Sequence, residues 1–81
     1  MLQVEVYIPS LDCSFEVEIN EHATVRAITG ELASLVEAQT GHAWADRDAL
    51  LLCCQEVRTV LPRGKTAYQC KVKPGNRLLL L

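Results

Sequence analysis

Apolar and polar residues alternate in two short segments near the start of the chain. In residues 2–8 (LQVEVYI) and residues 13–19 (CSFEVEI), every second side chain is apolar and those between are mostly polar. A β-strand places successive side chains on opposite faces, so this alternation predicts two half-buried strands. The short, turn-prone PSLD segment between them predicts an antiparallel hairpin. One face of this hairpin is apolar and needs a covering element.

The next segment has the spacing of an amphipathic helix. Thr24 suits the N-cap and Gly41 the C-terminal stop, which predicts a helix from Thr24 to Gln39. Gly30 lies inside this helix at a cost of about 1 kcal/mol relative to alanine, and close packing on the sheet is one explanation for it. Apolar residues recur every three or four positions and form one stripe, which would cover the hairpin: Val25, Ile28, Leu32, Leu35 and Val36.

The second half of the chain contains shorter elements. HAWADRDA is predicted to be a loop in which Trp44 plugs the edge of the core rather than binding a ligand. LLLCC is predicted to be a short strand, and QEV a turn into a fifth, minor extended piece. TVLPRGKTAYQ, with its proline and glycine, is predicted to cross irregularly. KPGN is a turn signal that leads into the last residues.

The final four residues are all leucine. They are too few to cross a bilayer, which needs about 20 apolar residues in a helix, and a membrane tag would need a second anchoring signal that is absent. A central strand beneath a helix is often apolar throughout. We therefore expect a last strand that runs parallel to the first in the middle of the sheet, with Leu78 and Leu80 facing the helix.

These elements together predict an α+β roll over residues 1–81. It consists of a mixed sheet of four to five strands with one main helix packed across one face, as a single domain. The expected core is assembled from the inward positions of every element: Leu2, Val4, Val6, Phe15, Val17, Ile28, Leu32, Leu50, Val72, Leu78 and Leu80.

The charge and the composition of the chain exclude several classes of partner and indicate a cellular location. The net charge of the 81 residues is −2 and the basic residues are scattered, which argues against a nucleic-acid or anionic membrane partner. The first residues lack the charged n-region and apolar run of a signal peptide, so a cytoplasmic protein is expected.

No constellation of residues points to catalysis, a metal or a cofactor. No C-x-x-C pair occurs, and the two histidines stand far from any metal-ligand pattern. There is no Cys–His spacing typical of a nucleophile and no glycine-rich phosphate loop. A secreted chain would allow three disulfide pairings, but we interpret the cysteines as small apolar core residues in a reducing compartment: Cys13, Cys53, Cys54 and Cys70.

The element order resembles the β-grasp, or ubiquitin-like, fold over nearly the whole chain. The resemblance rests on LQVEV, FEVEI, TVRAITGEL, Gly41 and VKPGNRLLLL. Within that superfamily, the length and the V-K-P-G-N-R-L turn followed by an immediate stop look most like the YukD/EsaB group. These small bacterial proteins are associated with type VII (Ess/Yuk) secretion systems of Gram-positive bacteria. The resemblance implies a non-enzymatic adaptor with a protein partner, for instance a type VII secretion component.

The end of this sequence differs from that of ubiquitin, and the difference helps to rank the alternative functions. Ubiquitin and the sulfur carriers of this fold end in a flexible Gly-Gly tail, whereas no glycine follows Gly75 here. Conjugation or adenylation at this terminus is therefore not expected. A regulatory binding module unrelated to secretion is the main alternative, because the fold serves many functions. A sulfur-carrier-type protein is the less favoured one.

Alternation also predicts a candidate binding surface. If residues 50–52 and 78–81 alternate as strands, Leu51, Leu79 and Leu81 point away from the helix. The third strand is a neighbour of the last in this topology, so Leu51 and Leu79 are expected close together, with Tyr7 nearby. The resemblance implies the same, because ubiquitin presents a similar patch at matching positions. Incidental exposure and a homodimer interface are the alternatives, and the oligomeric state is left open.

Overall fold

The hairpin predicted from the alternating segments is present. The computed structural model describes residues 1–81. Strands β1 (Leu2–Ile8) and β2 (Cys13–Ile19) pair antiparallel along their whole length. A 3₁₀ turn, η1 (Pro9–Leu11), joins them, and Asp12 after it takes a left-handed conformation with φ of 48°.

Helix α1 (Val25–Thr40) covers one face of the sheet, and its bounds agree with the prediction to within one residue. The Thr24 hydroxyl accepts a hydrogen bond from the Ala27 amide, and Gly41 ends the helix with φ of 74°. The explanation offered for Gly30 was wrong. Apart from the adjacent residues and the backbone of its own helix, a Cβ at this position would meet no atom within 4 Å, so Gly30 does not mediate close packing on the sheet.

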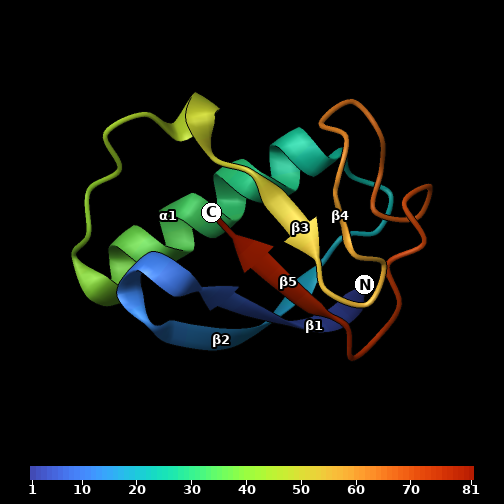
Figure 1. Cartoon of the computed structure of the whole chain (residues 1–81), viewed down its shortest axis with the longest axis horizontal. Coiled ribbons are helices and arrows are strands. Elements are labelled where there is room, and N and C mark those ends of the chain that lie inside the picture. The colour runs from blue at the N-terminus through green and yellow to red at the C-terminus, as the bar shows by residue number, and fades with distance from the viewer.

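The strands form one mixed sheet in the order β2-β1-β5-β3-β4 (Figure 1). As predicted, the last strand is central, parallel to β1 and next to β3. It pairs with β3 in the antiparallel direction. The third strand begins at residue 52 rather than 50, because Leu50 caps the 3₁₀ turn η2. The remaining elements are η2 (Arg47–Ala49), β3 (Leu52–Cys54), β4 (Thr59–Val60) and β5 (Arg77–Leu80).

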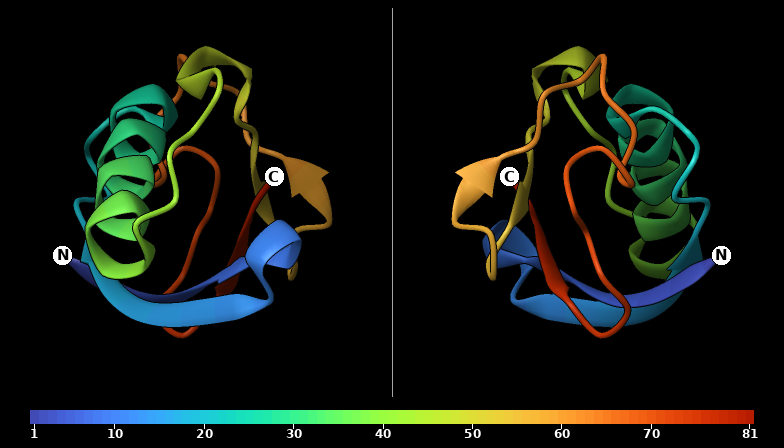
Figure 2. Two further views of the ribbon diagram at one scale, coloured as in Figure 1. Left: turned by 90° about the vertical axis from the view of Figure 1, so that its left-hand side faces the viewer. Right: turned by 90° about the vertical axis from the view of Figure 1, so that its right-hand side faces the viewer.

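The sheet curves around α1 and encloses the core between them (Figure 2). Leu78 and Leu80 of β5 are 0% and 1% exposed, so the leucine run is a buried central strand. Of the predicted core residues, Leu2, Phe15 and Val17 are only partly buried; the last two lie on β2, at the edge of the sheet. The others are buried.

Trp44 and three of the four cysteines contact this core, as the sequence predicted. Trp44 packs partly buried against it and its Nε1–H donates to the Ala33 carbonyl at 3.0 Å, which confirms the predicted plug. Cys54 is buried, and Cys13 and Cys70 pack against the core. The prediction was wrong for Cys53, which faces the opposite side of the sheet because adjacent strand residues alternate.

No helix here combines the length and apolar character that crossing a membrane requires.

Candidate protein-interaction surface

The face of the sheet turned away from α1 carries a row of apolar side chains. Tyr7 of β1 is opposite Leu79 of β5, Leu79 is opposite Cys53 of β3, and Cys53 is opposite Val60 of β4. Directly paired residues project their side chains from the same face of a sheet. The row therefore crosses four adjacent strands.

Leu51 and Leu81 continue this surface beyond the ends of β3 and β5. The amide of each donates to the carbonyl of the other, at 3.0 and 2.9 Å, which extends the strand register by one pair. Each stands two residues from a member of the row and so shares its face. We call the six residues the outer-face patch: Tyr7, Leu51, Cys53, Val60, Leu79 and Leu81.

The patch is partly open to solvent. Leu51 is 41% exposed, Val60 48% and Leu81 51%, whereas the other three side chains are half-buried. The structure thus places all four residues predicted for the site, Tyr7, Leu51, Leu79 and Leu81, on one face. Their binding to a partner stays a prediction.

Sequence reasoning missed two members of the patch. Cys53 carried a usable signal, because inward Leu52 and Cys54 force the residue between them outward. Val60 carried none that periodicity could detect, since β4 contains only two residues and depends on pairing with β3.

An ion pair borders the patch. The Arg77 Nε lies 2.7 Å from Glu5 Oε1, although the N–H does not point at the carboxylate as a hydrogen bond requires. The Arg77 guanidinium carbon also lies 4.5 Å from the centre of the Tyr7 ring. Such a cation–π contact stabilises by about 0.5–1 kcal/mol at an exposed site. Arg77 therefore fixes one face of Tyr7.

The hydroxyl of Tyr7 is held as well. It donates to Asp12 Oδ1 at 2.8 Å, and Asp12 reaches this position from its left-handed turn conformation. This hydrogen bond, chiefly, raises the pKa of Tyr7 above its ordinary value of 10.0, because it favours the protonated phenol. The ring is thus a neutral, oriented member of the patch.

Known structures share the arrangement of the sheet and helix. The ubiquitin-like domain of the Arabidopsis thaliana protein At2g32350 superimposes with a TM-score of 0.74, over 99% of this chain and 74% of its own, at 16% identity. The fold is the ubiquitin-like β-grasp. The N-terminal ubiquitin-like domain of the 4931431F19Rik protein gives a TM-score of 0.76 at 16% identity, over 99% of this chain and 72% of its own. No family model and no curated protein matches the sequence.

This ubiquitin-like chain presents no activated nucleophile at the patch. Burial raises the pKa of the Cys53 thiol above its ordinary value, so it stays protonated at neutral pH, whereas the thiolate is the reactive form. His22 stacks near Tyr68 and His42 meets Trp44 edge-to-face, with ring centres 5.6 and 4.6 Å apart. No His, Cys, Asp or Glu side chains gather in a group of three that could hold a metal ion.

Proposed function

We propose that this chain is a non-enzymatic ubiquitin-like binding module that contacts a protein partner through the outer-face patch. The observation that carries the proposal is the patch itself. Six apolar or aromatic side chains from four strands and their extensions meet on one face, and three of them are more than 40% exposed. Contiguous exposed apolar surface is typical of protein interaction sites.

The charges around the patch define the kind of partner that fits. On the same face, β1 and β2 place Glu5 opposite Glu16 and Gln3 opposite Glu18. Glu5 is compensated by Arg77, which leaves Glu16 and Glu18 exposed and without an ion pair. A partner with an aliphatic side chain for the patch and a basic residue toward β2 is complementary to this face.

The sequence resemblance to the YukD/EsaB group supports a more specific proposal. On this proposal the module acts in the cytoplasm as an accessory protein of a Gram-positive type VII secretion system, without direct membrane insertion. The support is the V-K-P-G-N-R-L turn and the strand that follows it. A regulatory module acting elsewhere is the alternative, because this fold serves many functions.

A pull-down separates these two roles. The chain is used as bait in a lysate of Gram-positive cells that express a type VII system, and bound proteins are identified by mass spectrometry. Enrichment of a type VII ATPase or membrane component supports the accessory role. Enrichment only of proteins unrelated to secretion supports the regulatory module and contradicts the secretion assignment.

A second assay addresses the carrier alternative. The chain is incubated with ATP and an activating enzyme of a sulfur-carrier protein, and adenylate formation is followed by pyrophosphate release and intact mass. We expect no adenylate, because Leu81 exchanges two hydrogen bonds with Leu51 and this segment is therefore not free to enter a narrow active site. Formation of a stoichiometric adenylate would contradict the proposal that this chain is a binding module that is not conjugated.

A further inference from the structure

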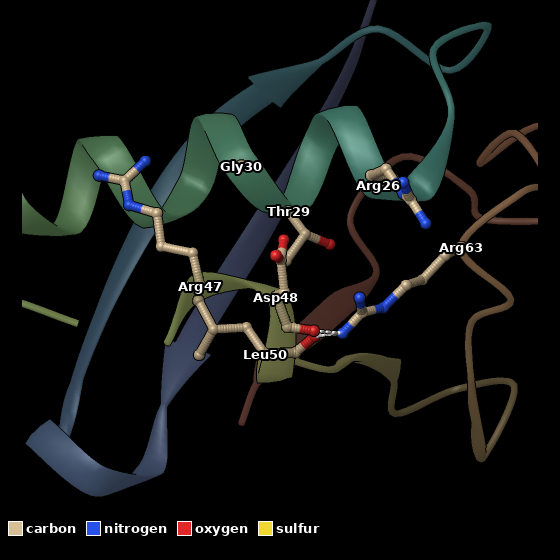
Figure 3. Close-up of a pocket in the computed structure, with 7 residues that line it drawn as sticks. All are labelled: Arg26, Thr29, Gly30, Arg47, Asp48, Leu50 and Arg63. Carbon is tan, nitrogen blue, oxygen red and sulfur yellow. Dashed lines mark hydrogen bonds between the residues drawn. The ribbon is translucent and has the colours of Figure 1, made fainter. Parts of the chain in front are cut away.

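A small cavity of about 210 Å³ lies between α1, η2 and the loop that contains Arg63 (Figure 3). It is separate from the outer-face patch. Its walls supply three guanidinium groups and one carboxylate, in a chain whose net charge is −2. The lining residues are Arg26, Thr29, Gly30, Arg47, Asp48, Leu50 and Arg63.

Arg63 is held in place but has no anionic partner. Its Nη2 donates to the carbonyl oxygens of Asp48 and Leu50, the latter at 2.8 Å. The residue is half-buried, yet no carboxylate lies within ion-pair distance of its guanidinium. The two carbonyl oxygens compensate part of the cost of taking the guanidinium out of water, and a bound anion would compensate more of it. The Nε and Nη1 groups of Arg63 remain as donors.

Arg26 adds a second free cation. It lies in the first turn of α1, where no acidic residue is present, although the positive end of the helix dipole favours negative charge there. Its side chain makes no hydrogen bond or ion pair. The amides of Val25 and Arg26 already donate to the carbonyls of Lys65 and Arg63, so the helix end offers positive potential rather than free donors.

The third arginine, Arg47, is already paired and is not available to bind an anion in the cavity. Arg47 donates to Ser34 at 2.9 Å and to Glu37 at 2.5 Å. In Figure 3 its guanidinium points away from the other two, whereas those of Arg26 and Arg63 lie at the same end of the cavity. The site is therefore formed by Arg26 and Arg63.

We propose that this cavity binds a single phosphate group between Arg26 and Arg63. Planar guanidinium groups recognise tetrahedral oxyanions through pairs of N–H donors. The volume is below the roughly 300–1,000 Å³ of pockets that enclose larger small molecules, so it suits one such group rather than a nucleotide. The Asp48 carboxylate, beside Thr29 in Figure 3, also lines the cavity, has no hydrogen-bond partner and limits the affinity. The phosphate is either free or carried by a phosphorylated side chain.

The test is a titration of inorganic phosphate into the ¹⁵N-labelled chain at low ionic strength, followed by NMR. We expect saturable shifts confined to residues around Arg26, Asp48 and Arg63. Arg26→Gln weakens binding roughly fivefold, the upper range for an exposed ion pair, and Asp48→Asn strengthens it. Arg58→Gln, in the distant turn between β3 and β4, is the matched control and leaves binding unchanged. Arg63 is kept because it anchors two carbonyls.

A second titration with a phosphoserine peptide and its unphosphorylated form identifies the source of the phosphate. Tighter binding of the phosphopeptide than of inorganic phosphate assigns the site to a phosphoprotein partner, and similar affinity assigns it to free phosphate. Absence of saturable shifts with both ligands overturns the proposal. Equal weakening by Arg26→Gln and Arg58→Gln also overturns it, because the binding would then be non-specific.

Discussion

Single side chains in this molecule join neighbouring elements, and Glu37 is the clearest case. Its Oε2 accepts from Arg47 of η2 at 2.5 Å, and Arg47 also donates to Ser34. The hydrogen bond from Arg47, chiefly, lowers the pKa of Glu37 below its ordinary value of 4.5. This pair fastens the loop after α1 to the helix surface.

The lowered pKa predicts how stability depends on pH. A carboxylate whose folded pKa is depressed stabilises the fold above its unfolded pKa, and this contribution disappears as pH falls through the folded value. Glu37→Gln should therefore lower the thermal midpoint near neutral pH, and the difference from wild type should shrink as the pH falls below 4.5 and the carboxylate becomes protonated. Thermal unfolding monitored by circular dichroism measures this. Glu31→Gln, at an exposed and unpaired position of α1, is the control, and a pH-independent difference for Glu37→Gln contradicts the account.

The cysteines give another prediction at this scale. Cys13, Cys54 and Cys70 contact the core and Cys53 lies in the outer-face patch, so each is explained by packing. Titration with a thiol reagent after denaturation without reductant should find all four thiols free. Elemental analysis should find no stoichiometric zinc. Cysteine-bound zinc, or a disulfide in the native protein, would contradict the packing interpretation.

At the scale of elements, two glycines differ in whether the backbone requires a glycine at their position. Gly30 lies mid-helix and a Cβ there would be free of contacts, so Gly30→Ala should raise the free energy of unfolding by about 1 kcal/mol. Gly75 is the matched control. Its φ of 82° disfavours any side chain, so Gly75→Ala should destabilise the fold. Urea denaturation measures both, and destabilisation by Gly30→Ala would show that the helix needs a glycine at this position.

The elements also show what could be predicted from the sequence. The first hairpin and α1 are long enough for several repeats of their periods, so alternation and capping located them. β3 and β4 have three and two residues, too few to establish a period, and their bounds depend on pairing with β5 and each other. Leu51, Leu79 and Leu81 were predicted because alternation could be applied within the expected topology.

The basic cavity could not be predicted in this way. Arg26 and Arg63 are brought together because the loop after β4 runs across the start of α1, where the carbonyls of Arg63 and Lys65 accept the first helix amides. Neither periodicity nor spacing encodes that contact. The charge imbalance of the cavity becomes visible only once the loop is placed.

At the scale of the whole molecule, β5 connects the two halves of the sheet. It pairs with β1 on one side and β3 on the other, and its Leu78 and Leu80 are buried in the core. Deleting residues 78–81 should abolish cooperative unfolding. Loss of one buried leucine costs about 2–5 kcal/mol, against a total of about 5–15 kcal/mol for a typical domain.

Circular dichroism and urea denaturation test this role of β5. Leu78→Ala is the milder variant and should remain folded with stability reduced by about 2–5 kcal/mol. The exposed Leu81→Ala is the matched control and should lose far less. A deletion that retains a cooperative transition would contradict the central place of β5.

Binding of the protein partner by the outer-face patch is tested with the double variant Leu51→Ser/Leu79→Ser. Tyr68→Ser is the control, because Tyr68 is 67% exposed but lies outside the patch. Leu79 lies in the central strand, so Leu51→Ser/Val60→Ser, at two more exposed positions, is used if the first variant loses its cooperative transition.

The most direct measurement is quantitative recovery of the partner by wild type, patch variant and control in parallel pull-downs, with folding of each bait verified by thermal unfolding. The folded patch variant should recover about tenfold less partner than wild type, because truncated central contacts cost on the order of 1–2 kcal/mol or more. Tyr68→Ser should match wild type. Undiminished recovery by the folded patch variant would contradict the claim.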